Sequence, residues 1–299
     1  MILSCNIAPL QNRFGYEKSL RLLKDAGFDA ADYSLEELSG SNSAFAGDDW
    51  EKVANEYREI AERIGIRINQ THAPAEFHKF SDQENYKNFI YPRICRSVEI
   101  SGIFGASVSV VHPIHYLYYH DYKEELFNMN MEFYSSLIPI CEKHNIRVGV
   151  ENMWRHDARR RYITFDTCGT TEEFIRYIDT LNSPWLVATL DVGHVGLPIG
   201  DDECWDFVRA LGHDRLKSLH IHDNNYKDDQ HLLPYLGKID WVKLCQALGE
   251  IDYTGDFTFE VSGYMSAGMD DAFVPVTLRY MADIGRHMID LIDASRPKS

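Results

Sequence analysis

The sequence predicts an α/β fold, a (β/α)8 barrel, from three observations. Short runs rich in apolar and β-branched residues alternate with longer amphipathic stretches along the chain. There are eight such runs, at intervals of roughly 25 to 45 residues, which leaves room for a helix after each one. The first run is not followed by the G-x-G-x-x-G turn that an open, doubly wound sheet would normally carry. Closure of a parallel sheet into a barrel is therefore the better prediction.

The predicted strands are short, and most of them end in a polar residue. In chain order they are Ile2–Ile7, Ala30–Leu35, Ile66–Thr71, Ser107–His112, Arg147–Glu151, Leu186–Asp191, Leu216–His220 and Asp256–Glu260. Valine, isoleucine and leucine recur in these runs, as expected for strands that are covered on both faces.

The segments between the strands carry helix signals at their ends. Residues 16–28 are amphipathic and are closed by Gly27, and residues 48–65 are opened by Asp48 and closed by Gly65. Near the carboxyl end, residues 239–251 form another amphipathic stretch, opened by Asp240. These patterns predict crossover helices on the outside of the barrel.

The chain is predicted to be one domain over residues 1–299. Barrels of roughly 250 residues or more are commonly single domains, and no Pro/Gly/Ser-rich linker divides this sequence. The longest segment between strands that lacks a helical pattern, residues 154–169, follows the fifth strand. We expect it to be a loop over the mouth of the barrel.

Composition and charge disfavour several classes of protein. The net charge of -16 opposes binding to nucleic acids and to anionic membranes. The six cysteines include no C-x-x-C pair, which argues against both disulfides and a thiolate metal site. The amino terminus lacks a signal-peptide pattern, and no apolar run reaches membrane-spanning length, so we expect a cytoplasmic protein.

Metal-ligating residue types gather at the predicted carboxyl ends of the strands, where barrel enzymes place their chemistry. The residues at these ends are His72, His112, Glu151, Asp191, His194, His220, His222 and Glu260. Any one of them has a structural explanation as a packed histidine or a helix cap. Three carboxylates buried together would repel one another strongly, however, and a divalent cation would relieve that repulsion.

Four of these residues, Glu151, Asp191, His220 and Glu260, form the predicted metal site. Three carboxylates and one imidazole suit Mn²⁺, Mg²⁺ or Co²⁺, whereas additional histidine ligands would favour Zn²⁺ or iron. The identity of the metal therefore stays open.

The same residues resemble those of the xylose isomerase-like TIM barrel superfamily, which includes sugar phosphate isomerases and epimerases and endonuclease IV-type endonucleases. The motifs that carry this resemblance span most of the chain: HAP at His72, HP at His112, GVEN at Glu151, D-x-x-H at Asp191, H-x-x-D at His220, and Glu260 at the last strand. In the epimerase branch, the resemblance implies one metal held by the four residues named above. It also implies that Glu151 and Glu260 move protons on a sugar enediolate, and the H-x-x-D spacing selects His220 rather than His222 as the ligand.

The endonuclease branch of the superfamily offers an alternative. It uses a cluster of three metals, and this sequence also matches the additional ligand positions of that cluster, which are His72, His112, His194, Asp229 and His231. These residues, together with His222, are predicted to bind one or two further ions or to contact substrate. The predicted function is a metal-dependent sugar or sugar-phosphate isomerase or epimerase. The alternatives are a multinuclear phosphodiesterase, a keto-sugar lyase or dehydratase, and a metal- or sugar-binding barrel without activity.

Other residues near the mouth bear on substrate and partners. Trp154, Tyr116 and Phe77 are candidates for stacking on a sugar, with core packing as the alternative for each. The arginine run at 155 and 159–161 is typical of a solvated loop, and a contact with phosphate is the alternative. The expected partner is a small sugar or sugar phosphate, and a homo-oligomer is compatible with the sequence.

Overall fold

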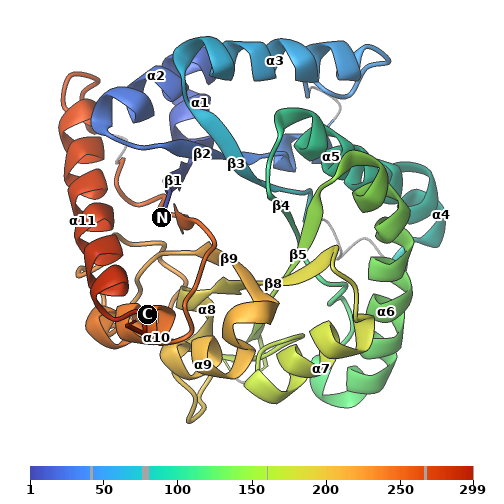
Figure 1. Cartoon of the computed structure of the whole chain (residues 1–299). Coiled ribbons are helices and arrows are strands. Elements are labelled where there is room, and N and C mark those ends of the chain that lie inside the picture. Colours follow the sequence, from blue (N-terminus) through green and yellow to red (C-terminus); the bar gives the residue numbers. More distant parts are fainter. Residues whose placement is uncertain (41–42, 76–80, 160, 266–267, 299) are drawn as a thin grey trace.

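The computed structural model describes residues 1–40, 43–75, 81–159, 161–265 and 268–298. Eight parallel strands form one sheet in the order β10-β1-β2-β3-β4-β5-β8-β9. A parallel bridge between Ile221, which follows β9, and Phe259 of β10 joins the two edges of this sheet. The helices surround the sheet, so the predicted (β/α)8 barrel is confirmed (Figure 1).

The barrel strands agree with the predicted ones to within one residue at each end. Their bounds are β1 Leu3–Asn6, β2 Ala30–Ser34, β3 Arg67–His72, β4 Val108–Val111, β5 Arg147–Glu151, β8 Leu186–Asp191, β9 Leu216–His220 and β10 Phe257–Phe259. Because neighbouring parallel strands end at the same rim, their carboxyl ends bring the predicted site residues together.

Helices follow the barrel strands and cover the outside of the sheet. The α-helices are α1 Ala8–Phe14, α2 Tyr16–Ala26, α3 Trp50–Ile64, α4 Gln83–Asn85, α5 Tyr91–Phe104, α6 Tyr119–His144, α7 Thr171–Leu181, α8 Val192–Val195, α9 Cys204–Arg215, α10 Trp241–Glu250 and α11 Val274–Ala294. A 3-10 helix, η1, covers Glu36–Ser39, and a π-helical turn, η3, covers Tyr86–Ile90. Among the helices of the described residues, none is both long and apolar enough to cross a membrane.

Most of the predicted helix ends are confirmed. Gly27 and Gly65 end α2 and α3 with left-handed φ angles of 101° and 76°. The carboxylate of Asp240 accepts a hydrogen bond from the Lys243 amide at the start of α10. The prediction for Asp48 is wrong by one residue, since the cap position of α3 is Asp49, whose side chain makes no capping bond.

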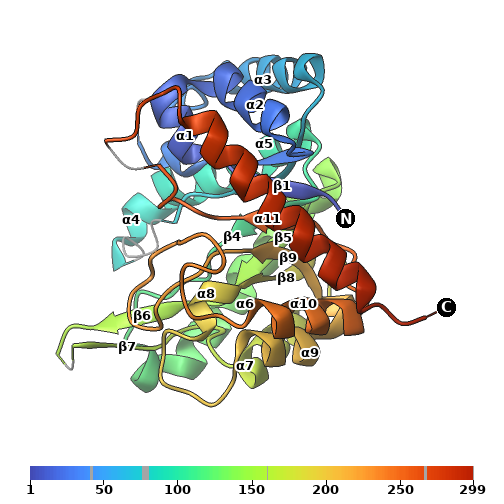
Figure 2. The ribbon, with the colours of Figure 1, turned by 90° about the vertical axis from the view of Figure 1, so that its left-hand side faces the viewer.

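The segment after β5 is not the loop that was predicted. Residues Trp154–Asp157 and Tyr162–Phe165 form the strands β6 and β7, which pair as an antiparallel hairpin. This hairpin projects from the end of the barrel opposite to the two chain termini (Figure 2). β6 is polar and shows no strand pattern, whereas the composition of β7 is typical of a strand, and the two pair with each other away from the barrel sheet.

Polar side chains cross-link the barrel strands in the interior. Ser4 of β1 donates a hydrogen bond of 2.6 Å to the Asn69 side chain of β3. The Asn69 amide in turn donates to Asp256 at 2.9 Å and to Thr258 of β10 at 3.3 Å. The strands that carry the site are therefore tied together by side-chain hydrogen bonds as well as by the sheet.

Candidate metal centre

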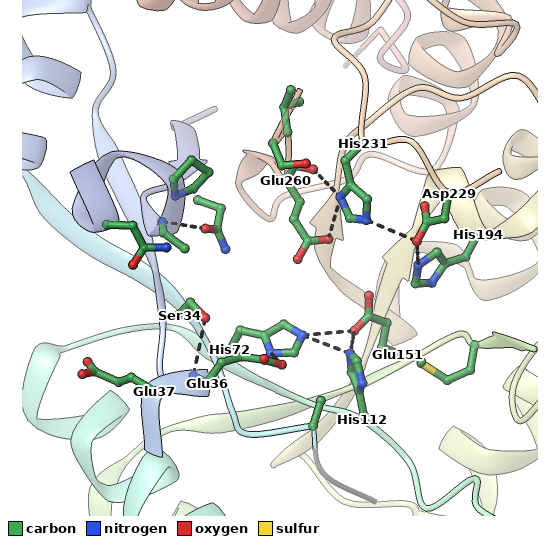
Figure 3. Close-up of a pocket in the computed structure, with 18 of the residues that line it drawn as sticks. Ser34, Glu36, Glu37, His72, His112, Glu151, His194, Asp229, His231 and Glu260 are labelled. Atoms are coloured by element: carbon green, nitrogen blue, oxygen red, sulfur yellow. Dashed lines mark hydrogen bonds and ion pairs between the residues drawn. The ribbon is translucent and has the colours of Figure 1, made fainter. Parts of the chain in front are cut away.

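A cavity of about 920 Å³ opens at the carboxyl ends of the strands. It is lined by residues with metal-ligating side chains, namely His72, His112, Glu151, His194, Asp229, His231 and Glu260. Three further predicted residues, Asp191, His220 and His222, are fully buried. The lining also includes Asn6, Gln11, Ser34, Glu36 and Glu37. Glu36 lies next to His72, with 4.0 Å between Glu36 Oε1 and His72 Nδ1 (Figure 3).

The four residues of the predicted metal site form one of three groups whose ligand atoms lie within 4.8 Å of one another. In this group His220 is central. Its Nδ1 atom lies 2.9 Å from Glu151 Oε1, 3.3 Å from Glu260 Oε2 and 3.9 Å from Asp191 Oδ2. These separations are close to the ligand-to-ligand distances of about 3 to 3.4 Å expected around an ion with bonds of about 2.1 Å.

A second group combines His72, His112 and Glu151. The Nε2 atoms of the two histidines lie 3.0 Å apart, and His112 Nε2 lies 2.9 Å from Glu151 Oε2. Glu151 belongs to both groups, because its Oε1 atom faces His220 and its Oε2 atom faces His112. A carboxylate in this position can bridge two ions.

The third group contains His194, His222, Asp229 and His231. Asp229 Oδ2 lies 3.4 Å from His194 Nε2 and 3.2 Å from His231 Nε2. The His222 ring stacks on the His231 ring, with 4.0 Å between their centroids. Its Nε2 atom lies 2.9 and 3.0 Å from the two oxygens of Asp191, so His222 connects the third group to the first.

Three of the histidines are oriented in the way that metal-ligating histidines usually are. Nδ1 lies 2.9 Å from the Ala73 carbonyl in His72, 2.8 Å from the Asn152 carbonyl in His194, and 2.7 Å from the Glu260 carbonyl in His231. A carbonyl oxygen can only accept, so Nδ1 carries the proton and Nε2 presents its lone pair to the cluster. In addition, Asp229 Oδ1 is buried without a hydrogen-bond partner. The residues therefore fit bound divalent ions.

Burial and the crowding of charges shift the pKa values in the metal-free site. Burial favours the neutral form of a histidine, but the neighbouring carboxylates outweigh it and raise the pKa of His72 to about 9, of His194 to about 10 and of His231 to about 9. Burial likewise favours a neutral Asp229, yet its two histidine partners hold the pKa of this carboxylate below its usual value. In the absence of metal, protons on the histidines balance the carboxylates.

Two residues that the sequence analysis did not select hold the site in place. The side chain of Asn152, next to Glu151, donates to the Asp191 carbonyl at 2.9 Å and accepts from the Asp191 amide at 2.8 Å. Asp223 is fully buried and accepts from the backbone amides of residues 237–239 and from the Trp241 indole. Asn152 belongs to the GVEN motif and Asp223 to H-x-x-D, so each motif contains a residue that orients a ligand segment.

Asp223 also constrains the loop that follows His231. The loop of residues 224–240 folds back so closely that a Cβ on Gly237 would lie 2.2 Å from Asp223 Oδ1. Tyr235 and Leu236 in the same loop are exposed. The glycine at 237 therefore meets the steric requirement of the loop, and the residues before it point outward.

The predicted substrate contacts have different outcomes. Trp154 lines the cavity and stands against His194, with 6.2 Å between the ring centroids. Arg155 forms an ion pair of 2.8 Å with the buried Asp166, so it does not lie in a solvated loop. Arg159 is exposed. Phe77 and Arg160 lie outside the described residues.

Comparison with known proteins places this geometry in context. The sequence profile of a family described as xylose isomerase-like TIM barrel matches residues 20–273. An uncharacterized protein of Methanocaldococcus jannaschii is 28% identical over 204 residues, which cover 68% of this chain and 67% of the relative. A D-psicose 3-epimerase of Enterocloster bolteae is 28% identical over 150 residues, or 50% of this chain and 44% of the relative.

Among solved structures, the D-psicose 3-epimerase of Clostridium cellulolyticum H10, determined with D-tagatose, is similar over nearly its whole length. The TM-score is 0.75, and the alignment covers 97% of this chain and 99% of the other, at 16% identity. At this level of identity the similarity concerns the fold.

Proposed function

The chain belongs to the xylose isomerase-like TIM barrel family, and from this membership we propose that it is a divalent-metal-dependent sugar isomerase or epimerase. One observation carries the proposal. Glu151 and Glu260 line the same cavity and both face His220 Nδ1, at 2.9 and 3.3 Å. Two carboxylates beside one potential metal site are what a proton transfer across a sugar carbon requires. The epimerase relatives and the epimerase fold support the same reading.

In this proposal the metal is held by Glu151, Asp191, His220 and Glu260. A divalent ion bound there supplies Lewis-acid polarisation of a sugar carbonyl and its neighbouring hydroxyl. Glu151 removes the proton from the carbon between these groups, which leaves the sugar as an enediolate, and Glu260 donates a proton to the opposite face. Each turnover moves one proton from Glu260 to Glu151, so the pair is reset by exchange with solvent.

The remaining groups orient these carboxylates. His222 holds Asp191 through hydrogen bonds of 2.9 and 3.0 Å, and Asn152 fixes the backbone of Asp191 on both sides. Full burial of Asp191, His220 and His222 excludes water from the inner side of the site. The protein thus presents preformed ligands and leaves only the cavity side open to the sugar.

The test combines metal analysis with two conservative variants. We expect the metal-loaded protein to incorporate solvent deuterium at one carbon of a ketose, and Glu151→Gln and Glu260→Gln each to slow this exchange about 10²- to 10⁴-fold. Glu59→Gln, an exposed position on α3, is the matched control and should exchange at the normal rate. Full exchange in both site variants would refute the assigned proton-transfer roles.

A second candidate function, hydrolysis of a phosphodiester by a multinuclear metal site, has its own supporting observation. The groups at His72 and Asp229 flank the central group, and Glu151 is shared between two of the three groups. Two or three ions there would activate a water molecule and bind a phosphate oxygen. Cleavage of abasic-site DNA by protein carrying three metal ions per chain would favour this function over isomerisation. Deuterium exchange in a ketose without such cleavage would favour isomerisation.

A further inference from the structure

A second cavity of about 340 Å³ lies beside the metal cavity. The two cavities share three lining residues, Ala75, His115 and Trp154, and so they are neighbours across one wall. The second cavity is otherwise lined by Tyr116, Arg155, His156 and Asp166. We call it the side cavity. Its volume falls in the range of about 300 to 1,000 Å³ that is usual for small-molecule sites.

Trp154 connects the side cavity to the metal centre. Its indole stands edge-on to the ring of His194, with an interplanar angle of 76°, while the same residue also lines the side cavity. Its backbone is held by the pairing of β6 with β7, in which Trp154 lies opposite Phe165. A fixed aromatic ring between two cavities is a suitable surface for the apolar face of a sugar ring.

The polar side chains that line the side cavity are held in place by hydrogen bonds to other protein groups. Arg155 donates from Nε to Asp166 Oδ2 at 2.8 Å, and its terminal nitrogen donates to the His115 carbonyl. Asp166 is fully buried, and its other oxygen accepts from the Thr167 amide at 2.7 Å. Fixed hydrogen-bonding groups of this kind are typical of sites that recognise a ligand by its hydroxyls.

The charges of both cavities oppose an anionic ligand. Arg155 is the one lysine or arginine among the described residues that line either cavity, and its charge is neutralised by Asp166. Glu36 and Glu37 also line the metal cavity, and Glu36 Oε1 lies 4.0 Å from His72 Nδ1. A phosphate group beyond the metal ligands would therefore meet carboxylates in the metal cavity, and in the side cavity it would meet an arginine that is already paired.

We propose that the substrate is an uncharged glycoside whose reacting sugar keeps a free or ring-opened carbonyl, with this sugar in the metal cavity and the second ring in the side cavity against Trp154. This inference rests on the proposed isomerase or epimerase function and adds to it the class of substrate. The second ring adds binding energy at a distance from the reacting carbon. A free monosaccharide leaves the side cavity empty and binds more weakly.

The test measures equilibrium binding to the metal-loaded protein by calorimetry. The probes are a panel of reducing disaccharides, such as maltose, cellobiose, lactose and lactulose, together with their component monosaccharides and the corresponding 6-phosphates. We expect at least one disaccharide to bind tenfold or more tightly than either of its components and than any sugar phosphate. A sugar phosphate that binds most tightly, or disaccharides that bind no better than monosaccharides, would overturn the inference.

Two variants restricted to the side cavity show where the second ring binds. Tyr116→Ala removes part of its wall, and His156→Trp fills it from an exposed position that tolerates a larger side chain. Both should weaken disaccharide binding about tenfold and leave monosaccharide binding unchanged. The control is Tyr162→Ala, an exposed residue of the same hairpin outside the cavity lining, which should alter neither.

The outcomes separate this inference from the proposed function. If monosaccharides bind and exchange deuterium but the two variants affect both classes of ligand equally, the side-cavity assignment is wrong while the isomerase or epimerase proposal stands. If no sugar of either class binds to the metal-loaded protein, the proposed function fails and the inference fails with it.

Discussion

At the scale of single residues, the fully buried pair His222 and Gly193 determines how Asp191 is held. A Cβ on Gly193 would lie 2.0 Å from Cε1 of His222 and 2.5 Å from its Nδ1. Gly193 lies in the short helix α8, and the neighbouring helix backbone leaves little room for movement. The glycine thus allows His222 to reach both oxygens of Asp191.

Gly193→Ala should therefore displace the His222 ring and loosen Asp191. We expect the free energy of unfolding to fall by about 1 to 3 kcal/mol, the usual cost of overpacking a buried site. Metal affinity should fall as well, because a ligand loses its orienting partner. Urea unfolding and metal titration measure the two effects.

The matched control for this variant is Gly268→Ala. An added Cβ at Gly268 has no heavy atom within 4 Å, so the change in stability should stay within about 0.5 kcal/mol. Normal metal affinity in Gly193→Ala would show that Asp191 does not depend on His222.

The sequence was sufficient to select the residues that converge at the site, but not their orientations. All ten selected residues, from His72 to Glu260, lie in the three groups, because the carboxyl ends of parallel strands meet at one rim. The Nδ1 bonds of His72, His194 and His231 could not be predicted, since their acceptors are backbone carbonyls. A carbonyl is present at every residue, and no side-chain pattern indicates which one is near.

At the scale of elements, the loop of residues 224–240 carries Asp229 and His231 and is anchored by Asp223. Four backbone amides and the Trp241 indole donate to this buried carboxylate. Asp223→Asn replaces one acceptor oxygen by an NH₂ group that faces donors. We expect a loss of about 2 kcal/mol or more in stability, the usual cost of unsatisfied buried polar groups.

The same variant should change metal stoichiometry in a selective way. Any ion bound by the group at Asp229 should be lost, whereas an ion bound by the group at His72 should be retained, because β3, β4 and β5 do not depend on this loop. Metal analysis of the purified variant measures this. Asp240→Ala, which removes the N-cap of α10 but none of the bonds to Asp223, is the control and should cost about 1 kcal/mol without metal loss. Equal metal loss in both variants would indicate general destabilisation rather than loss of the anchor.

The hairpin β6–β7 marks the limit of sequence patterns at this scale. The barrel strands are apolar and buried, so their composition predicted them to within one residue. The hairpin strands mix exposed, half-buried and buried side chains, and among the described residues they pair only with each other. Their stability comes from backbone pairing and from the Arg155–Asp166 ion pair, and neither produces an apolar period.

At the scale of the whole molecule, the acidic groups that matter for function lie together at the mouth of the barrel. Carboxylates and histidines of six strand ends and of one loop lie close together in three adjoining groups. Such a cluster is stable only if cations or protons balance its charge. The folding stability of the entire barrel should therefore depend on metal and on pH together.

The metal-free protein should lose stability as the pH rises above neutrality. The raised pKa values of His72 (about 9), His194 (about 10) and His231 (about 9) mean that the folded state binds protons more tightly than the unfolded state. The resulting stabilisation is complete below the unfolded value of about 6.5 and is lost between that pH and about 10. We expect the free energy of unfolding to fall over this range by an amount on the order of 1 kcal/mol or more for each histidine.

Ions bound by the groups of His72 and Asp229 should reverse this trend, because they would take the place of the protons on His72, His194 and His231. Metal affinity rises with pH as these histidines deprotonate, so the metal-loaded protein should keep its stability up to about pH 9 to 10. Urea unfolding of chelator-treated and metal-loaded protein at pH 6.5, 8 and 9.5 compares the two states. A metal-free protein that grows more stable across this range would show that the histidines are not protonated partners of the carboxylates.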